Sequence, residues 1–444
     1  MSGNVSSESD DDLARKVSSA QHPPSTTSSR ENLQPVKTAN SGFHRRSLPR
    51  AIIRRKSSQL ESFAPYDPEL ADRSVHFSNL IFDARFWQML KTAASYIFAT
   101  ILDKLSPPKG KEATEARRRE RAMRLKATCI ELGETFIKLA QFLSVRRDFL
   151  PTEIADELAQ LQDQVPPFDF TVVAATIQKD LGAPPEEIFA SFDPLPLASA
   201  SVGQVHLARL KNGTEVVVKV QRPDLRQRFY QDLGYMRLVV NWGRTLLGKN
   251  FDWDGWIELS DEFGRNLFCE VNYIQEGRNA DKLRRVLRDF EDVRIPRVFW
   301  KYTGRRVLTL EYAPGTKIDK LNELHARSIN LPKLARLLVN CYLEQVLMHG
   351  FFHADPHAGN LSIDDEGRLV IYDFGMMGEI TEEQRAAITG CISAVIRRST
   401  AELVENLRQL GILKHSANAQ PVERALQPFI DYYAGKEIRD LDFT

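Results

Sequence analysis

Three oxygen-bearing side chains toward the C-terminal end of the chain could hold a metal ion and phosphate groups together. Asp355 and Asn360 belong to residues 353–360, HADPHAGN, and Asp373 begins a DFG tripeptide. Phosphoryl transfer requires a carboxylate beside the attacking nucleophile and oxygen ligands for the Mg²⁺ that bridges the phosphates. This segment therefore predicts a site for Mg²⁺ and a nucleotide.

The spacing of these residues is that of a protein-kinase catalytic loop, in which H-x-D-x-x-x-x-N precedes a DFG tripeptide. Residues 360–363 and 369–372 read as two strands joined by a turn at 365–367. Such a hairpin would bring Asn360 and Asp373 to one metal ion. A DFG tripeptide alone is weak evidence, but the two motifs at this spacing are specific.

A rival hypothesis treats His349, His353 and His357 as transition-metal ligands at helical spacing. Two glycines and a proline within residues 350–359 interrupt any helix there, so the three rings would not share a face. No nearby carboxylate completes the pattern of a zinc hydrolase. The sequence therefore favours the nucleotide site over a metal-dependent hydrolase.

A lysine, Lys219, follows three valines in an apolar strand at residues 216–219. A buried ammonium group needs a charged partner, and in kinases this lysine holds the nucleotide phosphates and pairs with a glutamate on a helix. The helical segment that follows offers Glu270 and Glu276. The alternative is a lysine on an edge strand that points into solvent.

Residues 196–204, PLASASVGQ, stand where a kinase has its glycine-rich loop over the phosphates. Alanine and serine replace the glycines there. A β-carbon limits how closely the backbone can approach phosphate oxygens and disfavours positive φ. We therefore expect this loop to handle a nucleotide differently from an ordinary protein kinase.

The hydrophobic pattern predicts an α+β fold with the two lobes of a protein kinase. A strand-rich part with one helix precedes a mainly helical part, and Asn212-Gly213 marks the turn of a hairpin. The predicted helices are 112–147, one starting at 151, 256–289 and 330–349, and the predicted strands of the first lobe are 205–210, 214–221 and 307–312.

Composition limits the other classes of function. The net charge is +1, from 60 Lys and Arg against 59 Asp and Glu, which gives no field to attract nucleic acid. Residues 86–102 read as a packed rather than an interfacial helix, and no run is apolar enough to span a bilayer. Residues 1–62 are rich in Ser and Arg and read either as a disordered tail or as an organelle transit peptide.

Three motifs together resemble the UbiB/ADCK (aarF-domain) family of atypical kinases: ASASVGQVH at 198–206, EVNYIQE at 270–276 and HADPHAGN at 353–360. KLAQ at 138–141 stands in place of the family's K-x-G-Q motif. The resemblance extends over about residues 127–379, and residues 308–315 and 372–377 are similar to the cyanobacterial and plastid branch. It implies a kinase-like fold with an N-terminal helical extension over the cleft.

The resemblance also implies how the chain is divided. The helical extension would occupy 63–167, the kinase N-lobe with inserted helices 168–315 and the C-lobe 316–444, after the tail at 1–62. Because the chain ends soon after the DFG tripeptide and shows no Ala-Pro-Glu motif, we expect a shortened C-lobe.

The family's functional residues carry over by position. Catalysis would rest on Asp355, Lys219 and Glu276, and the metal ligands would be Asn360 and Asp373. The extension would cover the cleft through Lys138, Gln141 and Glu270. The nucleotide would lie against Ala198, Ser199, Ala200, Ser201, Val202, Gly203, Gln204, Lys219 and Glu311.

By resemblance, the chain would bind ATP or ADP with Mg²⁺ and support the synthesis or homeostasis of prenylquinones (ubiquinone, plastoquinone, tocopherol). The extension disfavours phosphorylation of proteins in trans. The implied partners are lipids or quinone precursors, quinone-synthesis enzymes and a membrane surface. A plastid location is expected, with a bacterial cytoplasmic membrane face or a mitochondrion as alternatives. A regulatory scaffold gated by nucleotide, without turnover, is the second hypothesis.

Three positions depart from the family pattern. Ala140 replaces the glycine of K-x-G-Q, and its methyl group is expected to loosen the docking of the extension. Asn272 replaces an aspartate, which removes a carboxylate near the cleft. Ala358 replaces a loop proline, with a mild expected effect.

Overall fold

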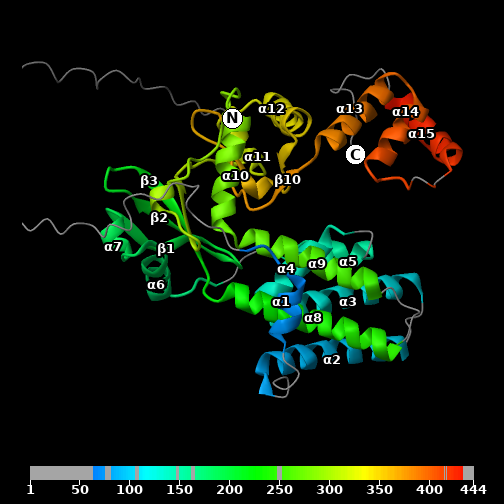
Figure 1. Cartoon of the computed structure of the whole chain (residues 1–444), viewed down its shortest axis with the longest axis horizontal. Helices are drawn as coiled ribbons and strands as arrows, with labels where there is room; N and C mark the ends of the chain where they lie inside the picture. The colour runs from blue at the N-terminus through cyan, green and yellow to red at the C-terminus, as the bar shows by residue number, and fades with distance from the viewer. Residues whose placement is uncertain are drawn as a thin grey trace, which may run out of the picture. The chain divides into compact units, whose positions relative to one another are not determined.

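A computed structural model describes residues 64–75, 82–105, 110–146, 150–161, 166–247, 253–414, 416 and 418–433 (Figure 1). The predicted tail or transit peptide at 1–62 lies outside the described residues. The described part is a mixed α+β protein with the two lobes of a kinase, so the predicted fold class is confirmed.

An antiparallel sheet in the order β1-β2-β3-β5 forms the first lobe. Its strands are β1 (Ser191–Ser199), β2 (Gly203–Arg209), β3 (Glu215–Gln221) and β5 (Val307–Glu311). The predicted hairpin is present, and Gly213 in its turn has a φ of 86°, which glycine adopts without strain. Val216, Val218 and Val220 are buried on one face of β3 in a core shared with α6 (Phe170–Leu181). Because side chains alternate along a strand, Lys219 points to the other face.

The loop predicted at residues 196–204 is shorter in the structure, a turn at 200–202 between β1 and β2. Residues 196–199 complete β1, and Ser199 pairs with Gln204 of β2. The connecting turn is tight, since Ala200 N donates to Gly203 O at 2.8 Å. The pairing shifts register around Pro196, which has no N–H to offer the ladder. That irregularity explains why the strand could not be read from its sequence pattern.

The predicted helix 256–289 is two helices, α9 (Trp253–Glu270) and α10 (Tyr273–Val286). They meet at Asn272, whose side chain caps α10 by accepting a hydrogen bond from Gln275 N at 3.2 Å. Asparagine and aspartate are equally good helix caps. The replacement of the family's aspartate at this position therefore keeps the capping function.

The second lobe holds the catalytic motifs between short strands. The predicted hairpin with a turn at 365–367 is present, with Leu361 paired to Ile371. The elements of this lobe are β4 (Val293–Arg294), β6 (Thr316–Lys317), α11 (Leu321–Ala326), α12 (Leu331–Leu343), a π-helical turn (Glu344–His349), β7 (Phe351–His353), β8 (Leu361–Ile363), β9 (Leu369–Ile371), β10 (Met377–Glu379), α13 (Glu382–Ile396), α14 (Thr400–Gln409) and α15 (Ala419–Tyr433).

The N-terminal extension is helical, as expected, but the predicted helix 112–147 is broken at Gly133, where φ is 87°. Its helices are α1 (Pro68–Ser74), α2 (Ala84–Leu105), α3 (Lys111–Leu132), α4 (Glu134–Ser144) and α5 (Thr152–Leu158). A residue with a β-carbon rarely adopts this φ, so Gly133 sets the direction in which α4 starts. Within the described ranges, no helix is both long and apolar enough to cross a bilayer.

Helix α8 (Leu225–Leu247) follows β3 in the chain and packs against the extension. Asp232 on α8 is fully buried and accepts two hydrogen bonds from Arg85 of α2, at 2.8 and 2.9 Å, and one from Thr135 of α4 at 2.5 Å. A bidentate pair of this kind fixes both distance and orientation. The extension and the helices inserted after β3 therefore share two apolar clusters. Figure 1 shows these helices lying side by side.

A cluster around Asp103 holds α2 against α3. Arg117, Arg121 and Arg124 donate to its carboxylate at 2.6, 3.2 and 2.6 Å. Although burial opposes ionisation, these hydrogen bonds from the three guanidinium groups lower the pKa of Asp103 to about 2. Because the folded-state pKa lies below the unfolded value, the stabilisation is present above about pH 4 and is lost as the pH falls toward 2.

Asp103→Asn is expected to lower the melting temperature at pH 7, because three guanidinium groups would then face one another without a carboxylate between them. At pH 2 the difference from the wild type should shrink. The matched control is Asp254→Asn, which removes an exposed partner of Arg244. Equal melting temperatures for Asp103→Asn and this control at pH 7 would contradict the prediction.

Candidate active site

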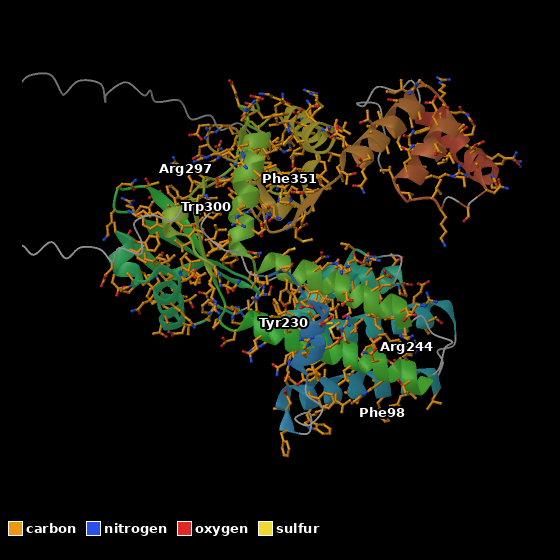
Figure 2. All side chains as sticks on the ribbon, in the orientation of Figure 1. Phe98, Tyr230, Arg244, Arg297, Trp300 and Phe351 are labelled. Atoms are coloured by element: carbon orange, nitrogen blue, oxygen red, sulfur yellow. The ribbon has the colours of Figure 1, made fainter. Side chains whose placement is uncertain are left out.

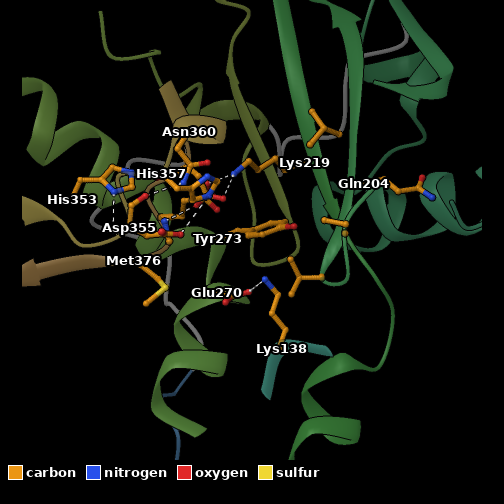
Figure 3. A pocket seen from close by; sticks show the side chains of 17 residues that line it. Lys138, Gln204, Lys219, Glu270, Tyr273, His353, Asp355, His357, Asn360 and Met376 are labelled. Atoms are coloured by element: carbon orange, nitrogen blue, oxygen red, sulfur yellow. Dashed lines mark hydrogen bonds and ion pairs between the residues drawn. The ribbon is translucent and has the colours of Figure 1, made fainter. Parts of the chain in front are cut away.

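A cleft of about 190 Å³ lies between the lobes and gathers residues from the extension, the first lobe and the catalytic motifs (Figure 3). Of the predicted site residues, the following line it: Lys138, Ala200, Val202, Gly203, Gln204, Lys219, Glu270, Glu276, Asp355, Asn360 and Asp373. Ligand pockets commonly measure about 300–1,000 Å³. The cleft is therefore narrow for a whole nucleotide and would have to widen to admit one.

Lys219 is held by two carboxylates. Its Nζ donates a hydrogen bond to Glu276, which is buried, and lies 3.8 Å from Asp373 Oδ2. Burial opposes the charge on Lys219, but the carboxylates of Asp373 and Glu276 raise its pKa above the ordinary value. The ammonium group therefore stays charged. Of the two glutamates that the sequence offered, Glu276 is the partner of Lys219. The Lys219 side chain is mostly buried and does not point into bulk solvent.

The two carboxylates beside Lys219 differ in exposure. Glu276 is buried and accepts the hydrogen bond from Lys219. Desolvation opposes ionisation of Asp373, but Lys219 and a hydrogen bond from Gly375 N at 3.0 Å lower its pKa. The side chain of Asp373 is 53% exposed, so its carboxylate stays ionised and accessible from the cleft.

Asp373 and Asn360 fit a small oxygen-seeking cation. Asp373 has a φ of 56°, a left-handed conformation that is uncommon outside glycine and that turns its carboxylate toward the cleft. Asn360 Nδ2 donates to Asp355 O at 3.2 Å, which leaves its amide oxygen as a ligand atom. Mg²⁺ takes one or two protein oxygens and completes its shell with phosphate and water. This donor set suits Mg²⁺ bound with a nucleotide.

His353 ties the catalytic loop to the DFG segment, a role that its place in the motif could have suggested. Asp355 N donates to its Nδ1 at 3.1 Å, so Nε2 carries the proton and donates to Asp373 O at 2.7 Å. The His353 backbone is itself fixed, because its N–H donates to the buried Gln345 and its carbonyl accepts from Tyr342. The ring therefore sets the distance between the two aspartates.

Helix α10 fixes the other side of the DFG segment through a residue that the sequence reasoning missed. Asn279 is buried, and its Nδ2 donates to Phe374 O at 2.8 Å. Gln275 in turn donates to Asn279 Oδ1 at 3.0 Å. Asn279 lies three residues after Glu276, on the same face of the helix. One helix thus positions both the partner of Lys219 and the backbone beside Asp373.

The extension reaches the cleft through Lys138 on α4, which points to Glu270 in Figure 3. Lys138 Nζ lies 2.8 Å from Glu270 Oε2. Both side chains are mostly buried. Ala140 is buried in the same helix, so its methyl group lies within the packed extension. Gln141 does not line the cleft; its Nε2 donates to Leu161 O at 3.0 Å within the extension.

Several predicted nucleotide-binding residues lie away from the cleft surface. Ser201 is fully buried, and Ala198 and Ser199 belong to β1. The carboxylate of Glu311 accepts from Arg294 at 2.9 Å and from Arg297 N at 3.2 Å. None of these four residues lines the cleft. A nucleotide could contact them only after the cleft rearranges.

The glycine that remains in this turn has a packing role. A β-carbon at Gly203 would lie 2.5 Å from Val220 O and 2.7 Å from Tyr273 Oη, so no larger residue fits there. Arg222 fastens the same turn, because its guanidinium donates to Ala200 O at 3.3 Å and to Pro166 O at 2.8 Å. Packing at Gly203 and the hydrogen bonds of Arg222 therefore hold this turn in a compact conformation.

The metal-hydrolase hypothesis finds no support in the geometry. Nε2 of His349 lies 3.3 Å from Glu344, the ring of His353 bonds to the DFG backbone, and Nε2 of His357 lies 3.6 Å from Asp355. Among the described residues, no three His, Cys, Asp or Glu side chains are placed to hold a metal ion together.

The fold and the cleft define a protein-kinase-like protein with an added helical extension. Residues 160–407 match the model of the ABC1 atypical kinase-like domain. The chain belongs to this family, so the resemblance inferred from its motifs is confirmed.

Cyanobacterial and chloroplastic proteins are among the relatives of this chain. An uncharacterized Synechocystis protein, sll1770, is 41% identical over 336 residues, which cover 75% of this chain and 57% of the relative. The chloroplastic protein ACTIVITY OF BC1 COMPLEX KINASE 7 of Arabidopsis thaliana is 42% identical over 320 residues, covering 72% of this chain and 46% of the relative. The chain thus spans about half the length of these relatives.

A solved structure supports the fold. The Mycobacterium tuberculosis protein Rv3197, in its complex with erythromycin, superposes with a TM-score of 0.51 at 24% identity. The match covers 72% of this chain and 81% of Rv3197. At this identity the likeness concerns the fold alone.

Proposed function

We propose that this protein is an atypical kinase or ATPase that binds ATP or ADP with Mg²⁺ and supports prenylquinone metabolism. The observation that carries the proposal is the joint position of Lys219, Glu276, Asp355, Asn360 and Asp373 around one cleft. Its relation to chloroplastic and cyanobacterial proteins favours a plastid or a bacterial membrane as the location. Quinone precursors, other lipids and quinone-synthesis enzymes are the proposed partners.

In this proposal Lys219 holds phosphate oxygens, and Glu276 keeps the ammonium group in place. Asp373 and Asn360 would hold Mg²⁺, which would neutralise charge on the phosphates. Asp355 accepts the proton of a hydroxyl group, or of water, as that oxygen attacks the γ-phosphorus and the bond to ADP breaks. The Asp355 side chain is 47% exposed, so an acceptor can reach it.

The acceptor is a small molecule or lipid rather than a protein. In the family that the motifs resemble, the extension takes the space where a protein substrate would bind, and the pair between Lys138 and Glu270 in the cleft supports the same arrangement for this chain. Mg²⁺-dependent ATP hydrolysis, assayed with and without a phenolic mimic of a quinone precursor, tests the proposal. Stimulated release of phosphate or phosphorylation of the mimic is expected.

The second candidate is a nucleotide-gated scaffold without turnover. The narrow cleft and its closed turn favour it, because both restrict the access of a nucleotide. Tight Mg-nucleotide binding with no phosphate release, even with lipids and precursor mimics present, would establish the scaffold and overturn the enzyme.

Lys138→Ala is expected to raise self-phosphorylation roughly tenfold, because a charge-assisted hydrogen bond of about 1.5–3 kcal/mol no longer holds the extension closed. Radiolabel incorporated from ATP measures the change. Lys126→Ala is the matched control, since it breaks a Lys–Glu pair of similar burial between α3 and α5, away from the cleft. The same rise in both variants would point to general loosening of the extension and would contradict a specific role for Lys138.

A further inference from the structure

The two proposed metal ligands lie just outside the apolar core of the second lobe. Leu361 of β8 and Ile371 of β9 are buried in this core together with Phe351, which is labelled in Figure 2. Asn360 and Asp373 lie at the open end of the hairpin, one residue before β8 and two residues after β9. Packing of the strands therefore fixes the hairpin, but the polar side chains at its open end need further contacts to hold them in place.

Lys317 on β6 touches the residue before each of these ligands. Its ammonium group donates a hydrogen bond to the carbonyl of Gly359, which precedes Asn360. The same group lies 4.6 Å from the centre of the Tyr372 ring, and Tyr372 precedes Asp373. One side chain therefore connects the catalytic loop to the DFG segment, although it lies 42 residues before Gly359 in the chain.

The segments that Lys317 connects are each held by further hydrogen bonds. The Tyr372 hydroxyl donates to Ala313 O at 2.5 Å and accepts from Ser362 Oγ at 2.8 Å. The backbone N–H of Tyr372 donates to Asn360 O at 2.8 Å. Lys317 itself pairs with Ser362 in the ladder between β6 and β8. Because both partners and the strand of Lys317 are held, its contacts constrain the two metal ligands rather than a loose loop.

The charge of Lys317 is used for these two contacts. Among the described residues, no carboxylate lies within ion-pair distance of its Nζ, and a carbonyl dipole and an aromatic face stabilise the ammonium group instead. Hydrogen bonds from a charged donor are stronger than neutral ones, and a cation over an aromatic ring adds to them. Lys317 does not line the cleft, so any effect on a metal ion has to pass through the two segments that it joins.

We infer that Lys317 is a positioning residue for the metal site. It holds the residue before each ligand and thereby sets the separation between the amide oxygen of Asn360 and the carboxylate of Asp373. His353 already joins the catalytic loop to the DFG segment at Asp355, and Lys317 adds a second connection at Asn360. The inference rests on the proposed function, because it concerns the Mg²⁺ that this function requires.

Lys317→Met tests this role, because it keeps an apolar chain of similar length and removes the ammonium group. It should raise the Mg²⁺ concentration for half-maximal nucleotide binding about tenfold, the lower end of the range for groups that orient metal ligands, since His353 still joins the two segments. Nucleotide affinity without metal should stay close to that of the wild type. Lys317→Arg should restore the Mg²⁺ dependence, because a guanidinium group can donate to the same carbonyl and stack on the same ring.

Titration calorimetry of ADP at a series of Mg²⁺ concentrations measures the shift, and the EPR spectrum of Mn²⁺ bound with ADP should change in Lys317→Met. Lys320→Met is the matched control and should behave like the wild type, since Lys320 pairs with Glu323 at 2.9 Å and does not line the cleft. Unchanged Mg²⁺ dependence in Lys317→Met would overturn the inference. An equal loss of affinity with and without metal would also overturn it, because that result indicates a merely structural role. A wild type that binds no Mg-nucleotide would refute the proposed function together with the inference, whereas the two preceding outcomes would refute the inference alone.

Discussion

Asp373→Asn is expected to weaken Mg²⁺-dependent nucleotide binding by at least about 100-fold, because losing a group that merely orients a metal ligand already costs 10–100-fold in metal affinity. ATP hydrolysis should fall with it. Asparagine should leave the backbone conformation at position 373 unchanged. Asparagine tolerates the left-handed backbone at this position, and its amide oxygen can still accept the hydrogen bond from Gly375 N. Titration calorimetry with ATP, with and without Mg²⁺, measures the effect.

Asp365→Asn provides the control for Asp373→Asn. Asp365 has a carboxylate that is 91% exposed in the turn between β8 and β9, and its ion pair with Arg327 lies outside the cleft. This variant should bind Mg-nucleotide like the wild type. If Asp373→Asn also bound it with unchanged affinity, the assignment of Asp373 as the metal ligand would be refuted.

Local sequence signals predicted those parts of the site that are positioned by residues close to them in the chain. The turns at Asn212-Gly213 and at residues 365–367 fixed both hairpins, and these hairpins carry Lys219 and connect Asn360 to Asp373. The spacing of the catalytic motifs was informative for the same reason. Each motif lies within a few residues of the strand that positions it, so the chain itself sets the distances.

Features that depend on contacts between distant segments could not be predicted. The role of Asn279 requires knowing that α10 passes beside Phe374, which lies 95 residues later in the chain. The break at Asn272 was hidden because Asn is not a strong helix breaker, although it is a favoured cap. Likewise, the exposed face of α2 has the composition of a packed face, and only its position in the fold shows that nothing among the described residues covers it.

The buried pair between Lys219 and Glu276 supplies the second large expected effect. Glu276→Gln should lower the free energy of unfolding by about 3 kcal/mol, the lower end of the range for removing one partner of a buried ion pair. The lower end applies because Asp373 remains 3.8 Å from Lys219 and still compensates part of its charge. Urea denaturation at pH 7 measures the change, and nucleotide affinity should fall in parallel because Lys219 loses its main hydrogen-bond partner.

The control for Glu276→Gln is Glu379→Gln, because Glu379 forms an exposed pair with Lys282 at 2.6 Å, and such pairs contribute about 0–1 kcal/mol. The effect of Glu276→Gln should be the same at pH 7 and pH 8. Lys219 has a pKa raised by folding, so its contribution to stability is complete below about pH 10 and declines only as the pH rises further. A loss as small as that of the control would mean that Lys219 is held by Asp373 alone. Asp373 would then be the anchor of Lys219, and Glu276 would take its place as the metal ligand.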